Sequence, residues 1–81
     1  MSASYKVMYF GLLAERRRRS EEDVTSGAET PAELYAELNG KHELGLETGN
    51  FKVAVNDAFV AWDHRLQPGD EIALLPPMSG G

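Results

Sequence analysis

The sequence lacks cysteine altogether. Disulfide bonds, thiolate metal ligands and a thiol nucleophile are therefore excluded. The two histidines, His42 and His64, lack the spacing to carboxylates that is typical of a metal site, so we expect both to be surface or turn residues. Asp63 beside His64 has no nucleophile in a recognisable setting, which argues against a general base. No glycine-rich phosphate loop is present, so we expect this chain to bind no cofactor and no metal.

Long apolar runs are also missing, because no stretch approaches the ~20 residues that a membrane span requires. The opening residues Met1–Ser4 do not form the basic start and apolar segment of a secretory signal. We therefore expect a cytoplasmic protein that makes no membrane contact.

Positive charge is scarce overall, with a net charge of −5, which argues against nonspecific binding to nucleic acid. It is also unevenly spread, since residues 1–20 carry a net +4 and residues 21–81 a net −9. The run Arg16–Arg19 is open to two interpretations: a docking patch for an acidic partner or RNA, or a solvated helix end neutralised by Glu21–Asp23. The neighbouring carboxylates favour the second.

Chain length allows one domain with one thin core, since 81 residues bury only roughly 60–65% of their unfolded surface. β-prone segments predict five strands: 5–10, a weak 22–25, 51–55, 59–62 and 71–75. Asn56-Asp57 and Pro68-Gly69 are typical turn pairs. Pro76 cannot donate a ladder hydrogen bond, so strand pairing should end there.

One helix signal is strong. Thr30 is a plausible N-cap, Pro31 suits the first helical position, and Glu33 completes a capping box. Three apolar residues then fall on one face at helical spacing: Leu34, Tyr35 and Leu38. Asn39-Gly40 is typical of a helix end. One or two helical turns are expected over 12–18, and irregular chain or a short helical turn over 41–50.

This element order predicts an α+β domain of the β-grasp kind, in which one main helix packs on one face of a mixed sheet of about five strands. We expect the domain to span residues 1–75 and an extended, flexible tail to span residues 76–81.

Strand alternation sorts the sheet residues into two faces. Lysine and glutamate should avoid the helix-covered face, which predicts a core, with the helix residues, of Val7, Tyr9, Phe51, Val53, Val55, Ile72 and Leu74. The open face then carries large apolar side chains with charged neighbours: Met8, Phe10, Phe59 and Leu75 beside Lys6, Lys52 and Glu71. Single exposed hydrophobic residues are ordinary. A cluster beside the tail instead favours a surface for protein docking.

The C-terminal residues are the other unusual feature. Pro76-Pro77 stiffens the exit from the sheet, and Gly80 and Gly81 have no side chains, so they can pass through a narrow tunnel. A catalytic site in another protein could then reach the terminal carboxylate, which would first need activation as an acyl-phosphate-type anhydride. The alternative is a trimmed or disordered tail.

Five segments together resemble one known family: 6–11, 30–31, 54–56, 66–71 and 76–81. In this sequence they read KVMYFG, TP, AVN, LQPGDE and PPMSGG. The chain resembles, over essentially its whole length, the small MoaD-type subunits of molybdopterin synthase. The proline pair, the glycine-aspartate turn and the Gly-Gly end make the resemblance specific.

The resemblance implies a ubiquitin-like sulfur carrier in molybdenum cofactor biosynthesis. Gly81 would be adenylated with ATP by an enzyme related to ubiquitin activators and converted to a thiocarboxylate with sulfur from a donor protein. The tail would then enter the large synthase subunit and give its sulfur to a cyclic pyranopterin. The chain would supply no catalytic residues of its own while forming one subunit of a sulfurtransferase. The absence of cysteine fits, since the sulfur would travel on the carboxyl carbon.

The resemblance also implies which residues bind the partners. The family's docking positions fall on Phe10, Phe59 and Leu75, and the tail contributes Pro76, Pro77, Met78 and Ser79. Gly80 belongs with Gly81 to the catalytic end of the tail. The run Arg16–Arg19 departs from the family pattern, and the sequence assigns it no role.

Three alternatives remain open at this stage. The first is a related sulfur carrier for thiamine, cysteine or tRNA thiolation. The second is an inert ubiquitin-like module that only binds proteins. The third is a protein modifier whose C-terminus forms isopeptide bonds with lysines.

Overall fold

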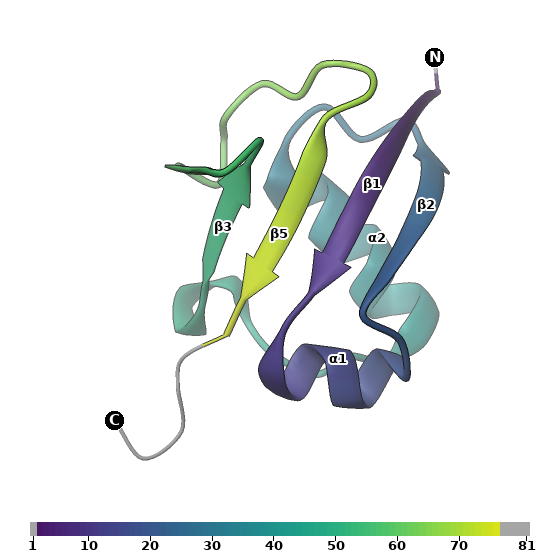
Figure 1. Cartoon of the computed structure of the whole chain (residues 1–81), viewed down its shortest axis with the longest axis vertical. Helices are drawn as coiled ribbons and strands as arrows, with labels where there is room; N and C mark the ends of the chain where they lie inside the picture. The colour runs from purple at the N-terminus through teal and green to yellow at the C-terminus, as the bar shows by residue number, and fades with distance from the viewer. Residues whose placement is uncertain (1, 77–81) are drawn as a thin grey trace.

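A computed structural model describes residues 2–76 of the chain. Its elements are β1 (Ala3–Tyr9), α1 (Gly11–Arg17), β2 (Glu21–Ser26), α2 (Pro31–His42), η1 (Thr48–Asn50), β3 (Lys52–Val55), β4 (Ala58–Val60) and β5 (Glu71–Leu75). The strands form one sheet in the order β2-β1-β5-β3-β4, with β1 and β5 parallel and the other pairs antiparallel (Figure 1). The predicted α+β fold, a β-grasp with a mixed five-stranded sheet, is confirmed.

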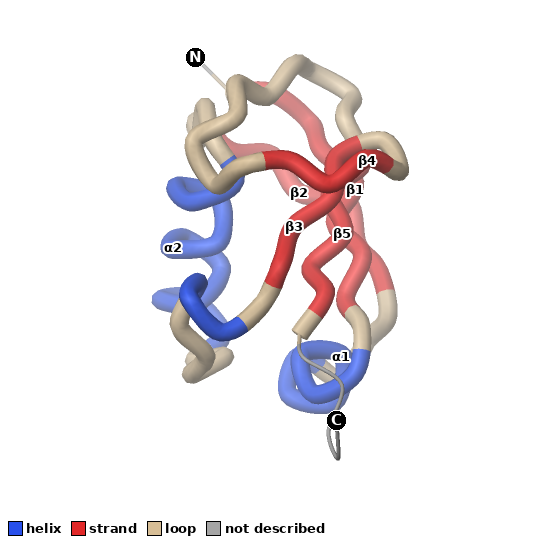
Figure 2. Tube along the Cα trace, turned by 90° about the vertical axis from the view of Figure 1, so that its left-hand side faces the viewer, coloured by secondary structure: helices blue, strands red, loops and turns tan. Residues whose placement is uncertain are grey.

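The helices lie in two different places relative to this sheet. α2 covers one face and leaves the other uncovered, while α1 lies at the end of the sheet where β1 and β5 finish (Figures 1 and 2). None of the helices in residues 2–76 is long and apolar enough to cross a membrane.

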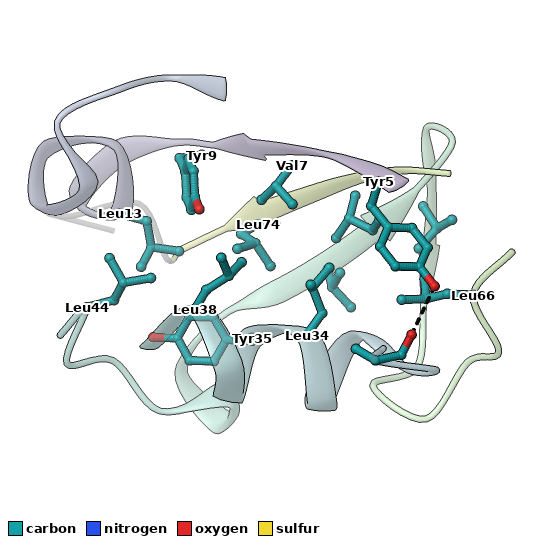
Figure 3. Close-up of a cluster of buried hydrophobic side chains, with 14 of the residues drawn as sticks. Tyr5, Val7, Tyr9, Leu13, Leu34, Tyr35, Leu38, Leu44, Leu66 and Leu74 are labelled. Carbon is teal, nitrogen blue, oxygen red and sulfur yellow. Dashed lines mark hydrogen bonds between the residues drawn. The ribbon is translucent and has the colours of Figure 1, made fainter. Parts of the chain in front are cut away.

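The core lies between the sheet and α2, where side chains of β1 face those of the helix (Figure 3). Every residue predicted to be in the core is buried: Val7, Tyr9, Leu34, Tyr35, Leu38, Phe51, Val53, Val55, Ile72 and Leu74. Strand alternation was sufficient here because Lys6, Lys52 and Glu71 occupy the opposite face of β1, β3 and β5.

Further core residues come from segments that the periodicity did not assign. Leu13 of α1 and Leu44 are completely buried, and Leu66 is nearly so. Tyr5 is also buried, and its hydroxyl donates a 2.9 Å hydrogen bond to the carbonyl oxygen of Ala28 (Figure 3). Small domains rely on such loop residues because the secondary structure alone supplies a thin core.

α2 begins as predicted and ends later than predicted. The Thr30 hydroxyl accepts a 3.2 Å hydrogen bond from the backbone N–H of Glu33. The helix continues through Gly40 to His42, and Glu43, at φ 53°, forms its left-handed C-cap. The predicted end at Asn39-Gly40 is therefore wrong. Asn39 stays helical, and its side-chain oxygen accepts a 2.7 Å hydrogen bond from Gly45 N–H, which fixes the following loop.

Several strand ends also differ from the prediction, by one or two residues. β1 stops at Tyr9, and Phe10 is instead the N-cap of α1. β4 ends at Val60, and Trp62 turns inward to stack edge-on against Phe51, with ring centroids 5.1 Å apart. An edge-to-face aromatic pair of this kind adds to the stability of the core.

Candidate docking face and tail exit

The uncovered face of the sheet carries a row of apolar residues across four strands. Met8 of β1 lies opposite Ala73 of β5, Ala73 lies opposite Ala54 of β3, and Ala54 lies opposite Phe59 of β4. Residues that pair directly across neighbouring strands point to the same side of the sheet. Met8 and Phe59, predicted from charge alternation to share the open face, are therefore brought onto it together.

Phe10, Phe59 and Leu75 come together at one end of this face. The exposed fractions of the Phe10 and Phe59 side chains are 40% and 70%, and Leu75 is half-buried. All three line one groove, together with Pro76. We call Met8, Phe10, Phe59 and Leu75 the docking face. Large aromatic side chains left this exposed on a small domain are typical of a protein-binding surface.

The point where the tail leaves the domain is held against the start of α1. A Cβ atom on Gly11 would lie 3.2 Å from Cγ of Pro76, and Gly11 has φ 55°, in the region that favours glycine. A larger residue at position 11 would therefore disturb the exit of the tail. The remaining predicted tail residues lie outside the described part of the chain: Pro77, Met78, Ser79, Gly80 and Gly81.

Charged residues border the docking face on the side away from the tail. The Lys6 ammonium lies 2.9 Å from the Glu21 carboxylate, and both side chains are about half exposed. This hydrogen-bonded ion pair, helped by the fields of Glu71 and Asp23, raises the pKa of Lys6 above its ordinary value. Because the ion pair is exposed to solvent, it contributes little to the stability of the fold. Its effect is to keep this border of the docking face polar.

A side-chain network that the sequence analysis missed fixes the start of β5. Asn56 donates a 3.0 Å hydrogen bond from its side-chain amide to the carboxylate of Asp70, and its side-chain oxygen accepts one of 3.0 Å from Glu71 N–H. The second oxygen of Asp70 accepts from Gln67 N–H at 2.8 Å. This network ties the β3–β4 turn to the strand that carries Leu75 and the tail.

The arginine run is engaged in internal contacts. Arg17 makes two hydrogen bonds to Glu22, of 2.9 and 2.7 Å, and Arg19 lies 3.6 Å from the same carboxylate. The Tyr9 hydroxyl also donates to Glu22. These contacts, the hydrogen bonds from Arg17 first, lower the pKa of Glu22 to about 2 despite burial. The prediction that neighbouring carboxylates neutralise the run is confirmed for Arg17 and Arg19.

Arg16, the first residue of the run, points to a different partner. Its guanidinium donates a hydrogen bond to the carbonyl oxygen of Leu44, at the start of the loop that precedes η1. Arg16, Arg17 and Arg19 thus all have partners within the domain, which leaves little of the run for binding RNA or an acidic protein.

A mixed five-stranded sheet with one helix across it and an apolar open face defines a protein of the ubiquitin-like β-grasp class. The sequence profile of the ThiS family matches residues 7–81, and the chain belongs to this family.

Individual proteins and structures are similar to this chain over almost its whole length. The molybdopterin synthase sulfur carrier subunit of Escherichia coli (strain K12) is 33% identical over 79 residues, which cover 94% of this chain and 98% of that protein. The crystal structure of SAMP1 from Haloferax volcanii has a TM-score of 0.80 at 28% identity and covers 98% of this chain and 100% of its own.

A third match comes from an assembly. It is a chain from the complex of subunits 1 and 2 of the molybdopterin-converting factor of Helicobacter pylori 26695. Its TM-score is 0.65 at 33% identity, and the match covers 96% of this chain and 99% of that one.

Proposed function

We propose that this chain is the sulfur carrier subunit of molybdopterin synthase and that its docking face binds the large subunit of that enzyme. The observation that carries the proposal is the groove in which Phe10, Phe59 and Leu75 meet Pro76, where the Gly-Gly tail leaves the domain. Two relatives of matching length support it. The E. coli protein is named a molybdopterin synthase sulfur carrier subunit, and the H. pylori chain comes from a complex of subunits 1 and 2 of the molybdopterin-converting factor.

The chemistry takes place on the Gly81 carboxylate. A carboxylate is a poor electrophile, so an adenylating partner first joins it to the AMP portion of ATP and releases pyrophosphate. Sulfur from a donor protein then displaces AMP and leaves a thiocarboxylate. In the large subunit each thiocarboxylate gives one sulfur to the cyclic pyranopterin, and water restores the Gly81 carboxylate. Two carrier chains in turn therefore supply the two sulfur atoms of the dithiolene that later holds molybdenum.

The chain itself supplies the reactant and its delivery. ATP belongs in the adenylating enzyme, and this chain holds no cofactor. The docking face positions the domain, the stiff Pro76-Pro77 pair directs the tail, and Gly80 and Gly81 present the carboxyl carbon without steric hindrance. Activation, sulfur transfer and use by the large subunit would follow one another in the cytoplasm.

A protein modifier is the second candidate, and one observation favours it. The fold matches SAMP1 of H. volcanii, and another solved structure of a protein from that organism is described as small archaeal modifier protein 1. A modifier would share the adenylation of Gly81 and differ in the next step, in which a lysine amine displaces AMP and forms an isopeptide bond.

Intact-mass measurement tests the proposal. After incubation with the adenylating enzyme, ATP and a sulfur donor, we expect a mass gain that matches exchange of one oxygen for sulfur. A chain without Gly81 is the matched control and should not change. With the large subunit and the pterin precursor, the mass should return to its original value as the dithiolene product appears.

Three outcomes would contradict the proposal. The first is an unchanged mass with an adenylating enzyme that activates another carrier. The second is a thiocarboxylate that forms but gives no pterin product, which would indicate a related thiolation pathway. Products joined to lysine side chains would instead establish the modifier.

A further inference from the structure

α1 presents one leucine outward and buries the next. Leu13 is completely buried in the core, whereas Leu12 is 41% exposed. Leu12 lines the same groove as Phe10 and Leu75, although it lies on α1 and outside the sheet. Neither the sequence pattern nor the family resemblance assigned this residue a role. Because this exposed leucine lines the same groove as the exposed aromatic residues Phe10 and Phe59, the apolar surface extends from the sheet onto α1.

The groove is large for a small-molecule site. It holds about 1130 Å³ of open space, above the ~300–1,000 Å³ that is typical of ligand pockets. α1 forms one wall with Leu12 and Glu15, and the segment around Leu46 and Asn50 contributes to the lining from another part of the chain. Its size and mostly apolar lining suit a segment of a protein.

Both walls of the groove are held in place by the domain itself. Arg16 of α1 hydrogen-bonds the Leu44 carbonyl oxygen, and the Tyr35 hydroxyl donates a 2.6 Å hydrogen bond to the Leu46 carbonyl oxygen. Gly45 beside Leu44 has φ 79°, in the left-handed region that favours glycine, and a Cβ atom there would lie 2.7 Å from the Arg16 guanidinium. Arg17 and Glu22 anchor the end of α1. A preformed groove loses less conformational entropy on binding than one that must be ordered.

The length of the tail limits which protein can lie over this groove. Pro76 is part of the lining, and five residues follow it. Five extended residues reach at most about 18 Å, at ~3.3–3.6 Å per residue. A protein that encloses Gly81 must therefore approach to within this distance of the groove.

We propose that the docking face extends along this groove onto α1, so that an apolar segment of the large synthase subunit lies between α1 and the 46–50 segment and packs against Leu12. This inference rests on the proposed function. It also gives Arg16 a role, since its hydrogen bond to the Leu44 carbonyl oxygen ties α1 to the loop that leads into the 46–50 segment.

The absence of cysteine from the chain allows a direct test. Leu12→Cys introduces a single thiol in the groove, and Ala36→Cys introduces one at an exposed position of α2. Both variants are treated with a maleimide alone and with saturating large subunit, and the mass of this chain reports labelling. We expect the large subunit to slow labelling of Leu12→Cys by at least about tenfold and to leave Ala36→Cys unchanged. Equal labelling of Leu12→Cys with and without the large subunit would overturn the inference.

A binding measurement separates the two proposals. Leu12→Asp should weaken binding of the large subunit by about tenfold or more, as substitution of an interface anchor typically does, while its thermal unfolding matches the wild type. If the wild type itself neither binds the large subunit nor yields product, the proposed function fails. If the wild type binds and Leu12→Asp binds equally well, only the groove inference fails. Protection of Leu12→Cys by the adenylating enzyme but not by the large subunit would also overturn it.

Discussion

Phe59 is the residue whose exposure is hardest to explain by folding alone. Its side chain is 70% exposed and lies between two hollows of the surface. Complete burial of a phenylalanine side chain stabilises a protein by roughly 1.5–3 kcal/mol of free energy. Phe59 gains little of this stabilisation in the isolated domain, because most of its side chain stays exposed. A partner that covers it would recover this free energy, and the same reasoning applies to Phe10.

Phe59→Glu should therefore weaken partner binding without unfolding the domain. We expect the dissociation constant for the large subunit to rise at least about tenfold, because a charge would replace a buried anchor. The free energy of unfolding should change by no more than about 0.5 kcal/mol, as for other surface substitutions. Titration calorimetry and chemical denaturation measure the two quantities. Ala36→Glu on α2 is the control, and equal binding by Phe59→Glu would remove this residue from the docking face.

Glu22 is the residue with the clearest effect on stability. Its side chain is only 9% exposed and receives hydrogen bonds from Arg17 and Tyr9. Since these contacts lower its pKa from 4.5 to about 2, the folded state binds fewer protons than the unfolded state between these values. The stabilisation is present above pH 4.5 and is lost as the pH falls through about 2.

Glu22→Gln should remove this pH dependence. At pH 7 we expect it to lower the free energy of unfolding by about 1–3 kcal/mol, because Arg17 loses a charged partner. The difference from the wild type should shrink steadily from about pH 4.5 to pH 2. Urea denaturation at several pH values measures it, with the exposed Glu47→Gln as control. A difference that stays constant with pH would show that the carboxylate charge is not responsible.

At the scale of elements, the β3–β4 turn determines where β5 begins. Asn56 and Asp57 both have positive φ, of 51° and 70°, as a tight hairpin turn of the primed type requires. The side chain of Asn56 then bonds both the buried Asp70 and the first residue of β5. One short turn therefore fixes the register of the strand that carries Leu75 and the tail.

Asn56→Ala should destabilise the domain by about 1–3 kcal/mol, because it strains the turn and leaves a buried carboxylate oxygen without its partner. Asn56→Asp retains the tolerance of positive φ but places a second negative charge beside Asp70, so it should also be destabilising at pH 7. Thermal unfolding measures both variants. A melting temperature of Asn56→Ala equal to that of the wild type would show that the network is dispensable.

The same elements show how much of the fold was predictable. Strand alternation and the Thr30 capping box are local signals, and they located all five strands and the start of α2. The end of α2 was missed because Asn39 bonds Gly45 from within the helix. The predicted β4 extends too far, to residue 62, because Trp62 packs on Phe51. This is a contact between separate segments, and no local sequence pattern reveals it.

For the whole molecule, the fold brings oppositely charged parts of the sequence together. Lys6 pairs with Glu21, and Arg17 and Arg19 pair with Glu22, so β2 offsets part of the positive charge of the first 20 residues. The shared surface position of Phe10, Phe59 and Leu75 could be predicted because charge separates the two faces of the sheet. Leu12 could not, since its exposure depends on how α1 is placed at the end of the sheet.

We expect the domain to carry the fold and the tail to carry the chemistry, and a truncation tests this division. The core found in residues 2–76 includes no residue later in the sequence than Leu74. A chain that ends at Pro76 should therefore keep its melting temperature within about 2 °C. Loss of 1 kcal/mol would instead lower it by about 4–8 °C in a domain of this size.

The truncated chain should still bind the large subunit, with weaker affinity, through the docking face and the groove. It should show no mass gain with the adenylating enzyme, ATP and a sulfur donor, because it lacks the Gly81 carboxylate. Circular dichroism, titration calorimetry and intact-mass measurement follow the three properties in one preparation. A fall in melting temperature beyond about 4 °C would mean that the C-terminal residues contribute to the stability of the fold as well as to its chemistry.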